Sequence, residues 1–359
     1  MSLFMMMWFT YRAWLVDYAP TVVPARTEQG AGTAPELPLE LPQLESPADS
    51  LPALTESGTP VETPPLEAAA RERLVRVRTD VFDIMIDTQG GDLVRVDLPS
   101  YPVDKDTPDL PVRLLDFLPE SRWVFQTGFL GVAAGDAPNH LAEFTSPRSD
   151  YVLADGDDEL IVTLGWQTSG PMRAQKIYTF RRGQYGIELN LVIENQSAEP
   201  WSGAPYAQLS RHHIPVERSY TSVESYSFTG PVLYDGDEYE KLDVEDLIQE
   251  PIDQTLSGGG LASIQHHFLA AAVPPAEDVV TYKAITRGSD YQLTALSQVR
   301  AVAPGDSLMY PVQLFVGPKL QDQLAATGNE LELTVDYGVL TILAQPLFWL
   351  LSKVHSFVN

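Results

Sequence analysis

The middle of this sequence, residues 72–335, consists of short strand-like runs separated by turn residues. The runs are rich in Val, Ile, Leu and aromatic residues, and pairs such as Gly90-Gly91, Arg182-Gly183 and Pro304-Gly305 separate them. Strands do not alternate with helices, as they would in a parallel sheet, and no repeat of fixed period occurs. The pattern therefore predicts a mainly β domain, a large antiparallel β-sandwich.

Individual strands can be placed along this domain. A first hairpin is expected over residues 81–96, with Gly90-Gly91 as its turn. Further strands are predicted at residues 123–126, 151–153, 160–166, 175–181, 187–194, 261–272, 279–286, 291–296 and 308–316. One short helix is predicted over residues 318–324, because proline is favoured at a helix start and Gly328 follows.

Residues 1–19 are apolar and carry Trp8, Tyr11 and Trp14. This run is shorter than the roughly 20 residues of a membrane-spanning helix, and it lacks the basic region and cleavage site of a signal peptide. A shortened, uncleaved membrane anchor and a short buried helix both fit. The aromatic cluster directly before acidic sequence favours the anchor.

Residues 20–71 differ from both neighbours in composition. They contain ten prolines and many acids, and Arg26 is their only base before Arg71. Such a segment has little apolar surface to bury, so it is expected to be a disordered linker. A proline-rich ligand for a small recognition domain is the alternative, but no paired basic anchor accompanies the prolines.

Residues 336–359 carry an apolar stripe at helical spacing. Asp336 is a suitable N-cap, and Pro346 is expected to bend the helix. The stripe predicts a helix that lies on a membrane surface, with these interface residues: Tyr337, Leu340, Leu343, Leu347, Phe348, Trp349, Leu350, Leu351, Lys353, Val354 and Phe357. A terminal helix packed on its own domain would show the same periodicity.

The chain is strongly acidic, with 49 acids against 23 bases and a net charge of −26. Nucleic acid is therefore not an expected partner, because phosphate binding needs a basic face. The absence of cysteine excludes disulfides, thiol catalysis and cysteine-based metal sites.

No sequence motif indicates catalysis or a cofactor. His212-His213 and His266-His267 are adjacent pairs, and adjacent side chains on a strand point to opposite faces, so neither pair is expected to hold one metal ion. The acidic clusters at 155–159 and 235–240 lack the ligand spacing of a calcium loop. No cofactor, no metal site and no enzymatic activity are predicted.

Several local motifs occur in a characteristic order. They are Thr79-Asp80-Val81, Gly90-Gly91-Asp92, Leu98-Pro99-Ser100-Tyr101-Pro102, Val316-Gly317-Pro318-Lys319, Asp336-Tyr337-Gly338, Gln345-Pro346 and His355-Ser356-Phe357. With the anchor, linker, β domain and terminal helix, they make the chain resemble the YidC family of membrane protein insertases from Gram-negative bacteria. The resemblance covers essentially the whole chain.

The resemblance implies a periplasmic β-supersandwich similar to sugar mutarotases, followed by an interfacial helix that leads to a transmembrane bundle. In the family, that bundle offers nascent membrane proteins a hydrophilic groove. The bundle has no counterpart in these 359 residues, so the chain is expected to be part of a longer protein. The implied location is the bacterial inner membrane, and the implied partners are the lipid bilayer, nascent membrane proteins and Sec translocon subunits.

An alternative function remains open from the sequence. An exported carbohydrate-binding or mutarotase-like domain would need a histidine and a carboxylate that meet in a cleft. His212 or His213 with Glu217 is the nearest such combination along the chain.

Overall fold

The computed structural model describes residues 73–132, 137–167, 170–215, 228–236, 238–328 and 331–334. All of them belong to one unit, Leu37–Asn359. The predicted anchor at 1–19, the linker at 20–71 and the terminal helix at 336–359 lie outside the described residues.

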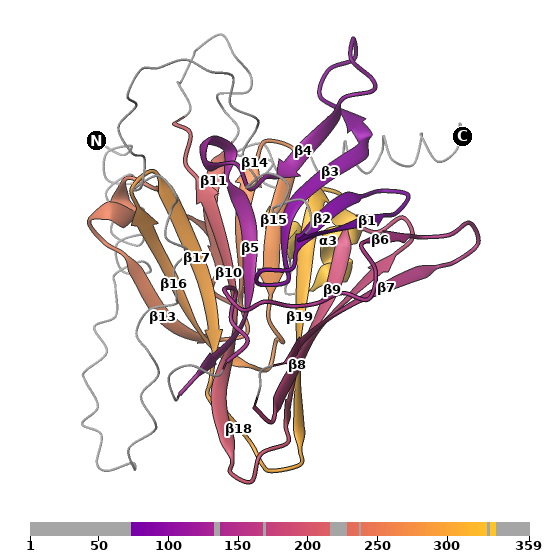
Figure 1. Cartoon of the computed structure of the whole chain (residues 1–359). Coiled ribbons are helices and arrows are strands. Elements are labelled where there is room, and N and C mark those ends of the chain that lie inside the picture. Colours follow the sequence, from indigo (N-terminus) through magenta and orange to yellow (C-terminus); the bar gives the residue numbers. More distant parts are fainter. Residues whose placement is uncertain are drawn as a thin grey trace, which may run out of the picture. The chain divides into compact units, whose positions relative to one another are not determined.

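Three sheets make up the described domain (Figure 1). The first has five strands in the order β4-β3-β2-β1-β6. Its strands are β1 (Leu74–Arg78), β2 (Asp83–Asp87), β3 (Asp92–Pro102), β4 (Pro111–Leu115) and β6 (Asp150–Val152). The pairing of β1 with β6 is parallel, and the other strand pairings among the described residues are antiparallel. The predicted mainly β, antiparallel fold is confirmed.

The second sheet has six strands. Its order is β13-β16-β17-β10-β18, and β5 also pairs with β10. The strands are β5 (Trp123–Gly131), β10 (Trp201–His212), β13 (Ile252–Ser257), β16 (Val279–Arg287), β17 (Asp290–Ser297) and β18 (Arg300–Val302).

The third sheet has eight strands in the order β12-β11-β14-β15-β19-β9-β8-β7. The strands are β7 (Glu159–Gln167), β8 (Met172–Arg181), β9 (Gly186–Asn195), β11 (Thr229–Tyr234), β12 (Tyr239–Lys241), β14 (Gly260–Gln265), β15 (Phe268–Val273) and β19 (Ser307–Pro318).

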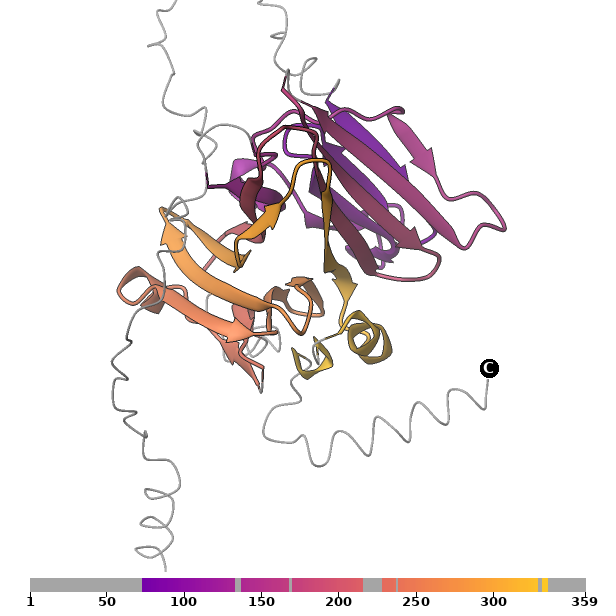
Figure 2. The same cartoon turned by 90° about the horizontal axis from the view of Figure 1, so that it is seen from below.

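The strand register shows how the sheets form two layers. Side chains alternate between the faces of a strand, and the pairings place Ser263, Ala270, Leu314, Ile187 and Tyr178 on one face of the eight-stranded sheet. Both smaller sheets cover that same face, and one cluster of buried apolar side chains joins all three sheets. Figure 2 shows the layers from below. The domain is therefore a sandwich with one large sheet opposite two smaller ones.

The longest strand of the six-stranded sheet, β10, was not predicted from the sequence. Its residues include Gly203, Pro205 and several polar side chains, which hide the alternation of a strand. Pro205 is tolerated because β18 pairs only as far as Gly203 and β17 begins to pair at Tyr206. Proline lacks the backbone N–H that a strand donates to its neighbour. On the side of β10 that faces β17 and β18, no strand is paired with Pro205, so no hydrogen bond is lost there.

Residues 261–272 were predicted as one strand, and this is wrong. The segment is two antiparallel strands, β14 and β15, joined by a two-residue turn at His266 and His267. His266 is the only non-glycine residue with positive φ, 48°, in the described part of the chain. Tight hairpin turns need positive φ at a central position, which glycine usually provides. Because two histidines occupy this turn, the local sequence contains no turn signal.

The predicted short helix is present, three residues later than expected. Helix α3 (Gln321–Thr327) begins after Pro318 has ended β19, and Gly328 follows it. It packs on the outer face of the large sheet, where the side chain of Gln323 accepts a hydrogen bond from the backbone N–H of Tyr185. The 3-10 helices are η2 (Pro119–Ser121), η4 (Asp246–Ile248) and η5 (Leu331–Thr334).

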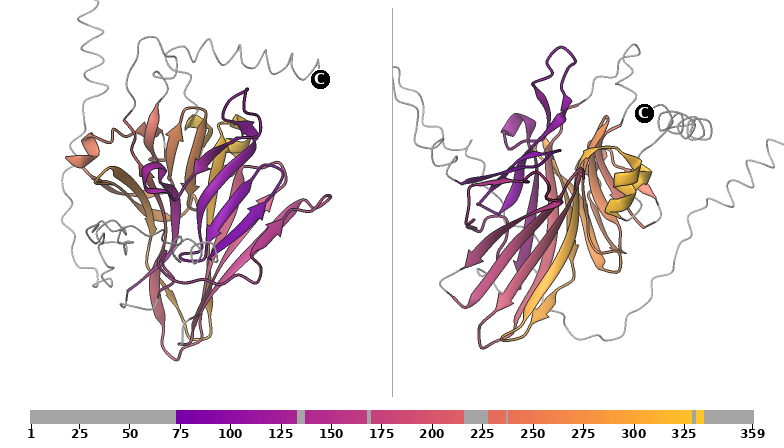
Figure 3. Two further views of the ribbon diagram at one scale, coloured as in Figure 1. Left: turned by 45° about the horizontal axis from the view of Figure 1, so that its top comes forward. Right: turned by 90° about the vertical axis from the view of Figure 1, so that its right-hand side faces the viewer.

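One end of the sandwich is called the hairpin end below. It comprises the β3–β4 connection (103–110), the β4–β5 connection (116–122), the residues after β10 (213–215), the turns at 266–267 and 288–289, and the β19–α3 connection (319–320). Backbone hydrogen bonds join neighbouring parts: His212 donates to Arg122, His213 to Ser289, and Lys319 to His267. The ring of Tyr101 at the β3–β4 hairpin lies 5.6 Å from the ring of Phe268. The left panel of Figure 3 turns this end towards the viewer.

Candidate functional site

A group of buried polar residues joins the three sheets. Asp92 begins β3, Thr127 lies in the middle of β5, and Lys176 lies in the middle of β8. Lys176 is 1% exposed, and its Nζ donates to Asp92 Oδ1 (2.6 Å), Thr127 Oγ1 (2.7 Å) and Thr127 O (3.0 Å). The backbone N–H and hydroxyl of Thr127 also donate to Asp92 Oδ1. These three residues are called the three-sheet joint.

Burial and charge oppose each other in the joint. Burial raises the pKa of Asp92 to about 6, although the Lys176 ammonium beside it favours the carboxylate. Burial lowers the pKa of Lys176, and Asp92 opposes this shift. Removing two charges from water carries a large desolvation penalty, which only close pairing and complete hydrogen bonding can offset.

The backbone approaches the joint closely at Gly91. This residue has φ of +66°, and a Cβ there would come within 3.2 Å of the Lys176 side chain. The hydroxyl of Tyr178 donates to the Gly91 carbonyl at 2.7 Å. A side chain at Gly91 would be strained by the positive φ and would press on Lys176 and Phe144, which explains the glycine at this position of the Gly90-Gly91-Asp92 motif. The joint is fully enclosed, and its geometry suits a structural role.

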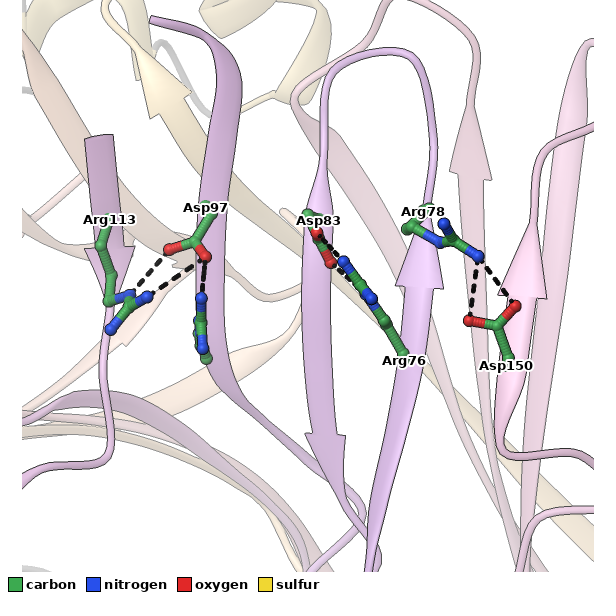
Figure 4. Close-up of polar contacts among 7 residues, drawn as sticks. Arg76, Arg78, Asp83, Asp97, Arg113 and Asp150 are labelled. Atoms are coloured by element: carbon green, nitrogen blue, oxygen red, sulfur yellow. Dashed lines mark hydrogen bonds and ion pairs between the residues drawn. The ribbon is translucent and has the colours of Figure 1, made fainter. Parts of the chain in front are cut away.

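The outer face of the five-stranded sheet carries a ladder of ion pairs (Figure 4). Its members are Arg76, Arg78, Asp83, Arg95, Asp97, Arg113 and Asp150. Arg76 Nε donates to Asp83 Oδ1 at 2.9 Å, and this hydrogen bond lowers the pKa of Asp83. Asp97 accepts from both Arg95 and Arg113, which come from β3 and β4.

The ladder has little binding capacity of its own. Each carboxylate already accepts from a guanidinium, and the arginine side chains are 34–45% exposed. The partly exposed pairs Arg76–Asp83 and Arg78–Asp150 contribute about 0–1 kcal/mol each, whereas the Asp97 carboxylate is buried and is shared by Arg95 and Arg113. The ladder therefore fixes the register of a sheet with short strands and does not leave a set of unpaired charges for a ligand.

Of the five described histidines, His213, His266 and His267 lie at the hairpin end, and His212 directly precedes it as the last residue of β10. His212 Nδ1 is 2.9 Å from Asp290 Oδ1, and Arg122 Nη1 donates to the other oxygen of the same carboxylate. His213 packs near Tyr291, and burial is the main reason that its pKa is lowered, with Arg211 contributing. The expected partner Glu217 lies outside the described residues. The histidine–carboxylate pair in the structure is His212–Asp290, and the same carboxylate also accepts a hydrogen bond from Arg122.

The prediction for the adjacent histidines assumes that each pair lies on a strand, and the two pairs differ in this respect. His212 ends β10 and His213 follows it, whereas His266 and His267 form a turn with ring centroids 3.8 Å apart. The premise that His266 and His267 occupy one strand is wrong. Within the described ranges, no group of three or more histidine, aspartate or glutamate side chains is arranged to hold a metal ion.

Arg211 links the six-stranded sheet to the large sheet at the same end. Its guanidinium stacks 3.8 Å from the Trp123 ring centroid and donates to Ser263 Oγ and to the Ile264 carbonyl. The Tyr291 hydroxyl shares Ser263 Oγ at 2.6 Å. These contacts hold the hairpin end in a defined arrangement.

The predicted membrane-interface residues of 336–359, from Asp336 to Phe357, all lie outside the described residues. Among the residues that the structure does describe, no helix is long and apolar enough to cross a membrane.

The sequence matches the family described as YidC periplasmic domain over residues 74–350. That range covers more than half of the chain and includes all of the three-sheet joint, the ladder and the hairpin end. The chain belongs to the YidC family. The resemblance seen in the motifs is thereby confirmed.

Individual relatives agree with this assignment. A membrane protein insertase YidC from Thioalkalivibrio sulfidiphilus is 38% identical over the whole of this chain. One from Methylococcus capsulatus is 39% identical over 97% of this chain. The chain spans 64% and 62% of the lengths of these two relatives.

Solved structures with a related fold carry sugar-enzyme names. A putative aldose 1-epimerase from Escherichia coli has a TM-score of 0.40 and 12% identity, and it covers 68% of this chain and 98% of its own. A galactose mutarotase-like protein from Lactobacillus casei has a TM-score of 0.42 and 10% identity, and it covers 68% of this chain and 99% of its own. Likeness at this level says nothing about what the present chain binds.

Proposed function

We propose that this chain is the N-terminal, periplasmic part of a membrane protein insertase and chaperone in the bacterial inner membrane. The observation that carries the proposal is the family match over residues 74–350, together with 38% identity to a named insertase over the whole chain. The protein would assist insertion and folding of nascent inner-membrane proteins, alone or with the Sec translocon, and would not be an enzyme.

The physical task of an insertase is to lower the barrier for polar groups that enter hydrocarbon. Each backbone or side-chain polar group without a hydrogen bond costs several kcal/mol there. The resemblance assigns that task to a transmembrane bundle, so the present chain would hold and orient the parts outside the bilayer. The enclosed joint and the paired ladder fit a rigid support of this kind.

The activity can be tested with a chimera. This chain replaces the corresponding part of the Thioalkalivibrio sulfidiphilus insertase, and insertion of a nascent membrane protein into proteoliposomes is measured. We expect the chimera to insert the substrate at a rate close to that of the parent. A folded chimera, incorporated as well as the parent, that inserts nothing would contradict the proposal.

The membrane contact of residues 336–359 is tested separately. The full chain is expected to bind phosphatidylcholine vesicles, and Leu347→Asp with Leu350→Asp should abolish binding because two charges then interrupt the apolar stripe. Thr341→Asp with Ser352→Asp, on the polar side, is the matched control and should retain binding. Undiminished binding by the Leu347 and Leu350 variant would rule out this helix as the membrane contact.

The alternative, a carbohydrate-binding or mutarotase-like domain, has one observation in its favour. His212 and Asp290 form a half-buried histidine–carboxylate pair beside the hairpin end. Calorimetric titration with simple hexoses tests it, and we expect no heat because Arg122 already holds the carboxylate. Heat that His212→Ala removes would support the alternative.

A further inference from the structure

Exposed apolar side chains are concentrated at the hairpin end. Ten large hydrophobic residues are exposed in the described part of the chain. Six of them lie in the connections of the hairpin end: Val103, Leu110, Phe117, Leu118, Ile214 and Leu320. At the opposite end, Met309 near the start of β19 is the only comparable residue among those described, while the other three lie on β6, β7 and η4.

Four of these side chains lie in two connections. Val103 and Leu110 close the β3–β4 hairpin, where the Val103 N–H donates to the Leu110 carbonyl, and they are 60% and 56% exposed. Phe117 and Leu118 lead into η2 and are 48% and 49% exposed. The β3–β4 hairpin projects beyond its sheet (Figure 1). Apolar groups on a projecting hairpin can reach a flat surface that the strands themselves cannot.

The path of the chain indicates what that surface is. Helix α3 follows the β19–α3 connection of the hairpin end, and the described chain finishes in η5 at Thr334. The predicted membrane-surface stripe begins at Leu340, six residues later. Six extended residues span at most about 20 Å. A stripe that lies on the bilayer therefore keeps Thr334 within about that distance of the lipid.

We propose that the hairpin end docks directly on the bilayer, with Val103, Leu110, Phe117 and Leu118 inserted among the lipid headgroups. This inference rests on the proposed function, because the terminal stripe supplies the first attachment. Once the stripe is bound, the domain is tethered at a high local concentration, so weak contacts by a few side chains become effective. Docking would fix the orientation of the sandwich above the membrane.

The negative charge of the β3–β4 hairpin tip predicts which lipid the hairpin end prefers. Asp104, Asp106 and Asp109 outnumber the single base Lys105. Anionic lipid repels this tip across a Debye length of about 10 Å at 0.1 M salt, whereas a zwitterionic surface does not. The contribution of the four apolar side chains should therefore be largest on phosphatidylcholine and should fall as phosphatidylglycerol is added.

The test uses the full chain and phosphatidylcholine vesicles. The variant Val103→Ser, Leu110→Ser, Phe117→Ser, Leu118→Ser is compared with Met309→Ser, whose side chain is 59% exposed at the opposite end. We expect the four-residue variant to bind about tenfold more weakly, as the loss of partial burial of four apolar groups implies, and Met309→Ser to bind unchanged.

The outcomes separate the two proposals. Unchanged binding by the four-residue variant, with binding still lost in the Leu347→Asp, Leu350→Asp variant, would overturn the docking of the hairpin end and leave the interfacial helix intact. Retained binding by the Leu347 and Leu350 variant would overturn the interfacial helix instead. A loss of self-association in sedimentation, with unchanged vesicle binding, would assign the surface to a second copy of the chain and also overturn the docking proposal.

Discussion

The three-sheet joint and the hairpin end differ in which groups they bury. At the joint, two charged side chains are enclosed and every charge has a partner within 3.0 Å. At the hairpin end, six large apolar side chains of the described residues are 41–64% exposed. The joint can therefore be explained within the described domain, because its partners are all present. The hairpin end needs a partner from outside it, and the bilayer is the one we propose.

The largest expected effect concerns the joint. Lys176→Met should lower the free energy of unfolding by about 3–5 kcal/mol, because it leaves the Asp92 carboxylate buried without a counter-ion. Urea unfolding followed by tryptophan fluorescence measures the change. The matched control is Arg76→Met in the ladder, where the exposed pair with Asp83 should account for about 0–1 kcal/mol. Equal losses in the two variants would contradict the distinction between joint and surface.

A smaller effect should appear as a dependence on pH. The pKa of Asp92 is raised to about 6, so the native state binds its proton more tightly than the unfolded chain does. The free energy of unfolding should therefore rise as the pH falls from about 7 to about 4, by about 2 kcal/mol from this group. The double variant Asp92→Asn, Lys176→Met is the reference, because it lacks the titrating pair. A difference between the two proteins that does not change with pH would contradict the raised pKa.

The smallest effect on stability is expected at the hairpin end. Phe117→Ser with Leu118→Ser should change the free energy of unfolding by no more than about 0.5 kcal/mol, because both side chains are already exposed in the free protein. The same urea titration checks this. A loss above about 2 kcal/mol would place these residues in the core and would remove them from any contact surface.

Several strands could be read from the sequence because their apolar residues alternate in a regular way. Strands β7 and β9 correspond closely to the predicted runs, and apart from Trp166 and Asn195 their buried side chains are Val, Leu and Ile. Strand β10 could not be predicted from the sequence. Its central proline, Pro205, is tolerated only because neither β17 nor β18 pairs with that residue. That information lies in the tertiary structure and not in the local pattern.

The joint was also missed, although the sequence held one signal. In β8, Ala174, Tyr178 and Phe180 point to the buried face of the strand, and Lys176 lies on that same face. A lysine on the apolar side of a strand indicates a buried partner. Its identity, Asp92, lies 84 residues away and depends on how the sheets pack.

The orientation of the hairpin end can be measured directly, because the chain has no cysteine and accepts a single label. Val103→Cys and Met309→Cys are each labelled with an environment-sensitive fluorophore, and the full chain is bound to phosphatidylcholine vesicles that carry a headgroup quencher. We predict strong quenching of the label at position 103 and little at position 309. Equal quenching at the two positions, or none at 103 while the chain is bound, would contradict docking through the hairpin end.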